Sequence, residues 1–389
     1  MRIAITGATG NLGTSVIGEL GRDSEVEEIV GIARRIPDLE LPKVRWEAAD
    51  MASSDLAPLF AGVDAVVHLA WALHPPRDSA YRRRVNVEGS RRVFDATKEA
   101  GVPALISATS FGVYSPNPPK TRERATIGVE DLVDENWPRD GIPTSSYSQE
   151  KVAVERSLDA LEQDAPNLRV VRFRPALVLK GDAASELRRL FVGGWVPLNL
   201  LRGPRLPLIP AVRGLAFQAV HTSDVAQAFH AAIKLPVRGA FNLAAHPVLD
   251  VDEIAHAIGG WKVPTDARVL RAFVELAWRA RIIPLDPGWI DLALQGPLLD
   301  TSRAARELDW KPDVTSVHAL RELVDGFAQN RSFATPPLQP NQRMADRVKD
   351  SPHTERLVEL SQELAEQMHH RSDELLSRWP LKPKDSRPS

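Results

Sequence analysis

Short apolar runs alternate with amphipathic stretches through the first 113 residues of the chain. The runs are typical of strands buried in a sheet, and the stretches between them repeat apolar positions at helical spacing. Strands are therefore predicted at 2–5, 28–33, 44–47, 65–69 and 104–108, with helices at about 12–20 and 85–100. This alternation predicts a doubly wound α/β fold, in which a parallel sheet carries helices on both faces.

The second part of the chain has a looser pattern. Residues 115–143 are rich in proline and charge and are predicted to form a loop. After them come a helix at about 146–161, strands at 170–173 and 240–243, and helices at 251–258 and 267–279.

Two later stretches differ in composition from the rest. Residues 180–213 carry a local net charge of +4 and are predicted to be part helix and part loop. Residues 331–389 form a tail with proline at both ends and apolar residues at helical spacing over 354–377. This tail helix is either a terminal helix that packs on the core or frays in solvent, or a helix that binds a partner or mediates oligomerisation.

Composition removes several classes of function. The 389 residues are 43% hydrophobic and 26% charged, with a net charge of −2, which argues against a globally basic nucleic-acid binder. The absence of cysteine excludes a disulfide scaffold, a thiolate zinc site and a cysteine nucleophile. No leader or membrane segment is recognisable. We expect a cytoplasmic protein with no metal, nucleic-acid or membrane partner.

A glycine-rich turn joins the first predicted strand to the first predicted helix. Gly7, Gly10 and Gly13 have the spacing G-x-x-G-x-x-G. The first permits a tight turn, the second lets a phosphate approach the backbone, and the third brings the helix close to the strand. Free N–H groups at the helix start would then bind a pyrophosphate. The candidate cofactor contacts in this turn are Gly7, Thr9, Gly10, Asn11, Leu12 and Gly13.

The end of the second strand is where an adenosine ribose would lie. A carboxylate there favours NAD, but this chain has Arg34 and Arg35. Two guanidinium groups suit a 2′-phosphate, so NADP is the preferred cofactor and NAD the alternative. A solvated surface pair is the plainer interpretation of the arginines. Asp50 and Met51, after the third strand, are candidates for contact with the adenine.

Tyr147 and Lys151 are the candidates for proton transfer. They stand four residues apart on a predicted helix and so share a face. A nearby ammonium group lowers the pKa of a phenol, which makes it useful as an acid or base. Ser110, at the end of the fifth strand and 37 residues upstream of Tyr147, adds a hydroxyl donor, with Thr109 as its alternate.

These motifs together resemble those of the extended short-chain dehydrogenases/reductases, the branch that includes nucleotide-sugar epimerases and dehydratases. The resemblance covers about 1–330 in the family's order. The matching segments are TGATGNLG at 6–13, Asp50-Met51, HLAW at 68–71, VNVEG at 85–89, SATSFGVY at 107–114, YSQEK at 147–151, RFRP at 172–175, VHTSDVA at 220–226 and LDTSRAARELDWKP at 299–312.

The resemblance implies roles for individual residues. Tyr147 would exchange a proton with the reacting oxygen, Ser110 would hydrogen-bond that oxygen, and Lys151 would hold the nicotinamide ribose. Asn86 would support a proton relay or the cofactor, or serve only the helix. Further cofactor contacts are implied at Leu69, Ala70, Trp71 and Pro175.

The resemblance also implies the domain organisation. A dinucleotide-binding Rossmann domain is expected at 1–179, with the chain returning to it at about 214–245. A smaller substrate lobe would combine 180–213 with 246–330, followed by the tail at 331–389. A homodimer through the helices near 86–100 and 146–161 is implied as well.

One position departs from the pattern of UDP-hexose epimerases. Those enzymes carry asparagine before the proline that follows the strand at 170–173, whereas this chain has Arg174. The Arg-Pro form is more typical of the family's reductases. The basic stretch still offers guanidinium groups to an anionic small-molecule substrate, or is merely a solvated loop. Its arginines are Arg188, Arg189, Arg202, Arg205 and Arg213.

Three functions compete on this basis. The leading hypothesis is an NAD(P)-dependent oxidoreductase that transfers hydride between nicotinamide and a carbonyl or secondary alcohol, with Tyr147 as the acid/base. The alternative is a nucleotide-sugar epimerase or dehydratase with tightly bound NAD. Phe111 stands where dehydratases usually have an acid, which counts against that activity. A non-catalytic NADP-binding sensor is the third hypothesis, although such proteins usually lose the tyrosine or the lysine.

Overall fold

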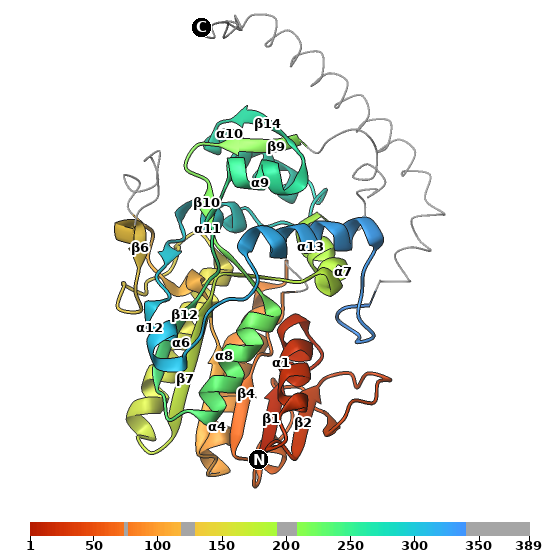
Figure 1. Ribbon diagram of the computed structural model, residues 1–389, viewed down its shortest axis with the longest axis vertical. Helices are drawn as coiled ribbons and strands as arrows, with labels where there is room; N and C mark the ends of the chain where they lie inside the picture. Colours follow the sequence, from red (N-terminus) through yellow and green to blue (C-terminus); the bar gives the residue numbers. More distant parts are fainter. Residues whose placement is uncertain (74–76, 118–128, 193–207, 340–389) are drawn as a thin grey trace, which may run out of the picture. The chain divides into compact units, whose positions relative to one another are not determined.

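A computed structural model describes residues 1–73, 77–117, 129–192 and 208–339 (Figure 1). Residues Met1–Pro340 form one compact unit. The tail helix expected at 354–377 and the arginines Arg202 and Arg205 lie outside the described residues. Within those residues, no helix combines the length and apolar character that a membrane crossing would require.

Seven parallel strands form the central sheet, which confirms the doubly wound α/β prediction. Their order across the sheet is β12-β7-β5-β4-β1-β2-β3, and every neighbouring pair is parallel. The order reverses direction between β1 and β4, which is where a doubly wound sheet binds its ligand. The strands are β1 (Arg2–Thr6), β2 (Glu28–Ala33), β3 (Val44–Ala48), β4 (Ala65–His68), β5 (Ala104–Ala108), β7 (Arg169–Pro175) and β12 (Gly239–Leu243).

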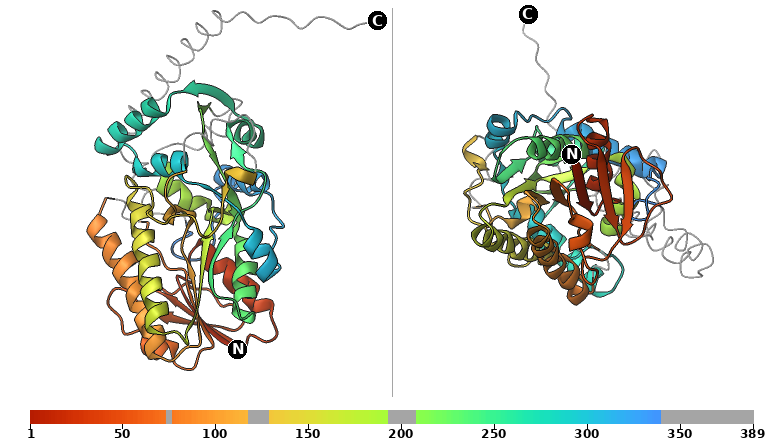
Figure 2. Two further views of the ribbon diagram at one scale, coloured as in Figure 1. Left: turned by 90° about the vertical axis from the view of Figure 1, so that its left-hand side faces the viewer. Right: turned by 90° about the horizontal axis from the view of Figure 1, so that it is seen from below.

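Successive side chains of the strands enter two separate cores, because residues along a strand alternate between faces. Ile3 and Ile5 pack beneath α1 (Asn11–Arg22) and α8 (Thr222–Lys234). Ala4 instead faces the helices α4 (Gly89–Glu99) and α6 (Ser146–Asp164). Figure 2 shows the two pairs of helices on opposite sides of the sheet. Burial on both faces explains the nearly continuous apolar runs.

The helix expected at 85–100 is longer than predicted and changes its winding midway. It starts as α3 (Ser79–Arg83), passes through a π-helical turn, η1 (Arg84–Glu88), and continues as α4. Asn86 lies inside the π-helical turn and is fully buried. Such turns widen a helix locally and are frequent at functional sites.

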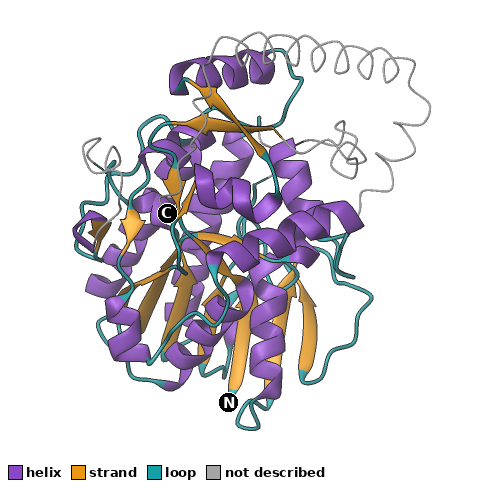
Figure 3. Cartoon of the chain, turned by 45° about the horizontal axis from the view of Figure 1, so that its top comes forward, coloured by secondary structure: helices purple, strands orange, loops and turns teal. Residues whose placement is uncertain are grey.

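Most of the chain beyond β7 lies at the carboxyl ends of the strands (Figure 1), but β12 belongs to the sheet and α8 covers it. Figure 3 shows helices and short strands gathered in a layer beyond one end of the sheet. The predicted helices at 251–258 and 267–279 appear as α9 and α10 with the same bounds. The helical segments of this layer are η4 (Gly181–Ala183), α7 (Ala184–Leu187), η5 (Arg188–Val192), α9 (Val251–Ile258), α10 (Ala267–Arg279), α11 (Gly288–Gln295) and α13 (Ser316–Gln329). The helix α12 (Ser302–Leu308) instead packs on β12 and α8.

Short strand pairs connect this layer to the rest of the molecule. They are β8–β11, β9–β14, β10–β13 and β6–β15, and periodicity misses them because most have only two or three residues. Their bounds are β6 (Leu132–Val133), β8 (Leu177–Leu179), β9 (Leu208–Val212), β10 (Ala216–Phe217), β11 (Ala219–His221), β13 (Leu249–Asp250), β14 (Trp261–Thr265) and β15 (Leu298–Leu299). The remaining short segments are α2 (Ala57–Phe60), η2 (Phe111–Val113) and η3 (Val129–Asp131).

His68, at the end of β4, joins three elements by hydrogen bonds. Its ring lies 2.7 Å from the Thr6 hydroxyl (Nδ1) and 2.9 Å from the Ser90 hydroxyl (Nε2). Burial lowers the pKa of His68 to about 3, and the charge of Lys151 acts in the same direction. The ring is therefore neutral at physiological pH. It ties β1 and β4 to α4.

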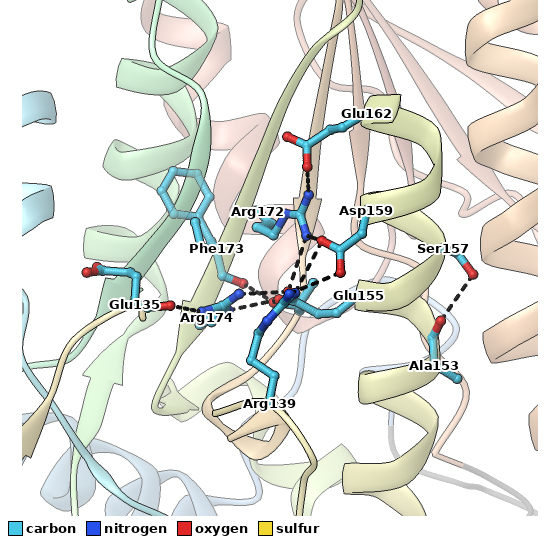
Figure 4. Close-up of polar contacts among 12 residues, drawn as sticks. Glu135, Arg139, Ala153, Glu155, Ser157, Asp159, Glu162, Arg172, Phe173 and Arg174 are labelled. Carbon is cyan, nitrogen blue, oxygen red and sulfur yellow. Dashed lines mark hydrogen bonds and ion pairs between the residues drawn. The ribbon is translucent and has the colours of Figure 1, made fainter. Parts of the chain in front are cut away.

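A buried carboxylate attaches α6 to the sheet (Figure 4). Glu155 is 1% exposed, and both of its oxygens accept hydrogen bonds from Arg174 of β7, at 2.9 and 2.8 Å. Arg139, at 3.0 Å, and Arg172, at 3.4 Å, also lie beside this carboxylate. Burial alone would raise the pKa of Glu155. The hydrogen bond and charge of Arg174, helped by Arg172 and Thr109, instead lower it to about 2.

Two further carboxylates on α6 complete this network. Asp159 accepts from Arg172 at 2.6 Å and lies 3.0 Å from Arg139, while Glu162 pairs with the other amino group of Arg172. Arg174 also donates to the Tyr114 hydroxyl and to the Glu135 carbonyl, each at 2.9 Å. The network thus fixes the rotation of α6 relative to β7.

We predict that Glu155→Gln lowers the free energy of unfolding by about 3–5 kcal/mol, because it leaves the buried guanidinium group of Arg174 without its counter-charge. The native carboxylate titrates near pH 2 and an unfolded one near pH 4.3. Its contribution to stability is therefore complete above the unfolded pKa and lost as the pH falls through the native one. Urea unfolding from pH 7 down to pH 2 measures both effects.

Glu162→Gln is the matched control, because Glu162 also pairs with Arg172 but its side chain is 32% exposed. Its loss should stay below about 1 kcal/mol. Equal losses in the two variants, or an unchanged acid limb in Glu155→Gln, would contradict the assignment of Glu155 as the anchor of α6.

Candidate functional site

The glycine-rich turn has the close backbone contacts that its spacing predicts. Gly7 has a φ of +73°, and a Cβ there would lie 2.6 Å from the Cα of Ala70. A Cβ on Gly13 would lie 2.3 Å from the Gly7 carbonyl oxygen. Neither distance is compatible with a side chain. At Gly10 the closest atom is 3.3 Å away, so the first and third glycines are the strictly required ones.

The turn ends at the N-terminus of α1, and this end suits an anion. Gly10 is the N-cap, no side chain caps the helix, and its first turn carries no acidic residue. Asn11 directs its amide nitrogen to the Val178 carbonyl at 3.4 Å, while its buried Oδ1 has no hydrogen-bond partner. Helix N–H groups of this kind bind phosphates. The residues present therefore fit the pyrophosphate of a dinucleotide.

The glycine-rich turn is stabilised by contacts of three further candidate residues, Leu12, Leu69 and Ala70. Leu12 packs against the core beneath α1, and the Leu69 N–H donates to the Thr6 carbonyl at 3.1 Å. Ala70 supplies the backbone that leaves no room for a side chain at Gly7. The ends of β1 and β4 are therefore held in contact.

A distant segment also touches the turn, which sequence reasoning missed. Thr335, which is fully buried, donates its hydroxyl proton to the Thr9 carbonyl at 2.8 Å. Leu338 is fully buried in the adjoining core. No local pattern marks these residues, since the contact joins positions 326 residues apart.

Arg34 and Arg35 follow β2 and are exposed. Because β2 runs parallel to β1, they lie at the same end of the strands as the glycine-rich turn. Arg34 is hydrogen-bonded to the Tyr81 hydroxyl, and the guanidinium carbon of Arg84 lies 5.6 Å from the centre of the same ring. A third guanidinium therefore lies close to the predicted ribose position.

Asp50 and Met51 form a turn after β3. The carboxylate of Asp50 accepts a hydrogen bond from the Ala52 N–H at 2.9 Å, and the Met51 carbonyl accepts one from Arg92 at 3.0 Å. Met51 is buried, with its Cβ close to Gly89. One Asp50 oxygen and the neighbouring backbone are therefore engaged in shaping this corner.

The structure brings Tyr147, Ser110 and Lys151 together at the carboxyl end of β5. The Ser110 hydroxyl accepts a hydrogen bond from the Gly112 N–H at 3.0 Å. A Cβ on Gly112 would lie 3.3 Å from the Tyr147 ring and 3.4 Å from that hydroxyl, so Tyr147 and Ser110 flank this glycine. The Ser145 side chain caps α6 and places Tyr147 in the first turn of the helix.

The pKa of Tyr147 differs from the expectation. Burial raises it to about 12, and the charge of Glu150 acts in the same direction, while a hydrogen bond with Ser110 lowers it. Lys151 makes no contribution to lowering the pKa of Tyr147, although its Nζ lies 5.9 Å from the centre of the Tyr147 ring. Lys151 Nζ donates to the Ala108 carbonyl at 3.1 Å and lies 3.6 Å from the centre of the Trp71 ring. Burial lowers the pKa of Lys151 to about 7.

Aromatic rings enclose Tyr147. Trp71 meets it edge-on with ring centres 5.9 Å apart, and Trp289 of α11 lies tilted against it at 4.7 Å. Such arrangements are favourable for aromatic pairs. The surroundings of the candidate proton donor are therefore largely apolar.

The polar side-chain atoms of Thr109 and Asn86 are hydrogen-bonded to other groups of the protein. Thr109 donates to Glu155 at 2.8 Å and is buried, so Ser110 is the hydroxyl beside Tyr147. Asn86 accepts from the Ala72 N–H at 2.7 Å and donates to the Glu150 carboxylate at 2.7 Å. Asn86 therefore holds the segment that carries Trp71. No role for Glu150 was predicted from the sequence, although its position next to Lys151 in the chain could have indicated that it lies at the site.

Arg174 and Pro175 lie at the end of β7. Pro175 is in register with Leu243 of β12. Arg174 is 2% exposed, and its donors go to Glu155, Tyr114 and Glu135. At the position where UDP-hexose epimerases have asparagine, this chain therefore has a buried arginine that is hydrogen-bonded to other residues of the protein.

The basic stretch at 180–213 does not present all its arginines to a ligand. Arg189 donates to the backbone carbonyls of Pro337 and Gln339. Arg213 is exposed. Within the residues that the structure describes, no group of three or more side chains is arranged to hold a metal ion.

Curated proteins similar to this chain match it over most of its length. An uncharacterized protein of Mycobacterium tuberculosis is 24% identical over 349 residues, covering 87% of this chain and 86% of its own length. The 3-diazoavenalumate denitrifying reductase of a Streptomyces species is 28% identical over 328 residues, covering 80% of this chain and 96% of its own.

Solved structures share the fold. MoeE5, in complex with UDP-glucuronic acid and NAD, superposes with a TM-score of 0.60 at 20% identity, covering 85% of this chain and all of that one. The family model of the NAD dependent epimerase/dehydratase family matches residues 3–244, more than half of the chain. With the glycine turn, the parallel sheet and the tyrosine–lysine helix in the family's order, the chain belongs to the NAD dependent epimerase/dehydratase family.

Proposed function

We propose that this chain is an NADP-preferring carbonyl reductase that acts on a small-molecule substrate. The observation that carries the proposal is the meeting of Tyr147 and Ser110 beside Gly112, next to Lys151 and at the carboxyl ends of the strands. When bound, the cofactor supplies a hydride to the carbonyl carbon. The chain itself holds the carbonyl oxygen and provides the proton.

Tyr147 is the proposed proton donor. With its pKa raised to about 12, the phenol stays protonated across the physiological range. A protonated phenol is able to give its proton to the carbonyl oxygen as negative charge develops there. Ser110 would hold the same oxygen by a hydrogen bond. Lys151 would face the nicotinamide ribose once its site is filled.

Two further observations support reduction over sugar-nucleotide epimerisation. Trp71 and Trp289 give Tyr147 an apolar surrounding, which suits a carbonyl carried on an aromatic or alkyl group better than a hydroxyl-rich pyranose. Arg174 is occupied by Glu155 and cannot serve a nucleotide phosphate. The similarity to the Streptomyces reductase, over 96% of that protein, points the same way.

The preference for NADP rests on Arg34 and Arg35, with Arg84 close by. All three are exposed, and guanidinium groups bind phosphate oxygens through paired, charge-assisted hydrogen bonds. The 2′-phosphate is the group that distinguishes NADP from NAD. The cytoplasmic location and the homodimer remain predictions of the sequence. The exposed positions of α4, where the dimer would form, are charged.

We predict that Tyr147→Phe lowers the turnover number by about 10²–10⁴-fold, the usual contribution of a positioned proton donor. NADPH should still bind, since the ring is retained. Turnover is followed as NADPH oxidation with a panel of aromatic and aliphatic aldehydes and ketones, and binding by NADPH fluorescence.

Tyr114→Phe is the control for loss of a buried phenol hydroxyl, because Tyr114 bonds Asn242 and Arg174 away from the site. It should cost stability but keep turnover. Undiminished turnover in Tyr147→Phe would refute the role of this residue. Isomer formation from UDP-hexoses without added cofactor would refute the reductase assignment.

We predict that Arg34→Ala together with Arg35→Ala weakens NADPH binding by about tenfold or more, as expected when charge-assisted contacts to a phosphate are removed. NADH binding should change by less than about twofold, because NADH lacks that phosphate. Fluorescence titration with both nucleotides measures the change in preference.

Arg91→Ala, at an exposed position on α4, is the matched control for loss of surface charge. It should leave both affinities unchanged. Parallel losses for NADPH and NADH in the double variant would show that the arginines act only through general electrostatics and would remove the basis of the NADP preference.

A further inference from the structure

Helix α10 presents apolar side chains to solvent along one face. Val269, Phe273 and Leu276 follow one another at a spacing of four and three residues, which places them in one stripe. Their exposed fractions are 64%, 66% and 68%. Val274 and Ala277, which flank the stripe on one side, are buried. Large apolar residues exposed singly are ordinary, but a continuous stripe on one helix marks a binding surface.

Exposed arginines flank the stripe, and one exposed carboxylate, Asp266, lies at the N-cap of the helix. From Arg268 to Ile282, a segment described in full, the exposed residues are apolar or arginine, and none is a carboxylate. They are Arg268, Val269, Ala272, Phe273, Leu276, Arg279, Ala280, Arg281 and Ile282. Ile282 itself is 58% exposed. We refer to these nine residues as the α10 face.

The one carboxylate within α10 itself, Glu275, is engaged in ion pairs with arginines. Glu275 is partly buried between Arg271 and Arg279, and Arg271 also pairs with Asp291 of α11 at 2.8 Å. Figure 1 shows α10 beside β14 at the top of the view, with the N-terminus at the bottom. The α10 face therefore combines an apolar centre with a basic rim.

From this geometry we propose that the α10 face binds the surface of an anionic phospholipid bilayer. An amphipathic helix with arginine beside its apolar face inserts shallowly at the headgroup boundary, where apolar burial and attraction to anionic lipid act together. The charge also argues against a second copy as the occupant. Pairing two α10 faces would bring Arg268, Arg279 and Arg281 of one chain against the same residues of the other.

This inference revises the expectation of no membrane partner, which rested on the absence of a spanning segment. Binding at the bilayer surface needs only one apolar stripe on a helix, not a helix that crosses. It is independent of the proposed reductase activity. It also places the membrane close to the site, because Arg271 joins α10 to α11, and Trp289 of α11 contacts Tyr147.

The test uses the full-length protein and sedimentation with large unilamellar vesicles. One set contains phosphatidylcholine alone, and the other contains equal amounts of phosphatidylcholine and phosphatidylglycerol. We expect the protein to sediment with the anionic vesicles and not with the neutral ones. Raising NaCl from about 50 mM to about 500 mM should weaken this binding, since it screens the attraction between arginine and lipid.

Two variants separate the apolar from the basic contribution. Leu276→Glu should lower the partition coefficient for anionic vesicles by about tenfold or more, because it places a carboxylate in the apolar stripe. Arg268→Gln with Arg281→Gln keeps the stripe and should lose the preference for anionic lipid. Leu235→Glu, at an exposed leucine after α8, is the matched control and should bind as the wild type does.

Circular dichroism and NADPH binding confirm that each variant is folded. The proposal is overturned if the wild type fails to sediment with anionic vesicles, or binds both compositions equally. It is also overturned if Leu276→Glu binds like the wild type. The molecular mass in solution is also measured at increasing protein concentration. If it doubles for the wild type but not for Leu276→Glu, a second copy covers the α10 face instead.

Discussion

The buried carboxylate of Glu155 is the constraint on which the geometry of the site depends. A carboxylate removed from water is stable only with counter-charge, and Arg174, Arg172 and Arg139 supply it. Arg172 and Arg174 belong to β7, so satisfying this charge fixes how α6 lies against the sheet. Tyr147 and Lys151 project from the same helix. Their position relative to β5 and Ser110 therefore follows from an electrostatic requirement one to two turns further along.

Steric exclusion constrains the other part of the site, the glycine-rich turn, to a comparable degree. The backbone of the glycine turn passes so close to Ala70, and then to itself, that Gly7 and Gly13 have no room for a Cβ. This closeness brings β1, β4 and the start of α1 together and leaves the helix N-terminus uncapped. The same contacts thus stabilise the corner of the fold and prepare it for phosphate. Thr335 adds a hydrogen bond to this corner from the far end of the described chain.

The expectation about Tyr147 shows where residue spacing misleads. Four residues on a helix do place Lys151 on the same face, but proximity along a helix says nothing about where a flexible ammonium group points. Here the ammonium group lies over Trp71 and 5.9 Å from the centre of the Tyr147 ring, yet burial dominates the pKa of the phenol and raises it. The identity of the pair was readable from the sequence. The pKa values of the two residues could be assigned only with the surrounding side chains in place.

The sequence by itself determined the seven strands of the central sheet, the glycine turn, and the candidate residues Ser110, Tyr147 and Lys151, because periodicity and short motifs are local properties of the chain. Only the tertiary structure decided that Arg174 serves Glu155, that Trp289 covers Tyr147, and that the apolar stripe of α10 faces outward. Each of these depends on contacts between distant segments. An amphipathic pattern gives the same signal whether its apolar face meets a core or the solvent, so its partner is settled only when the chain is folded.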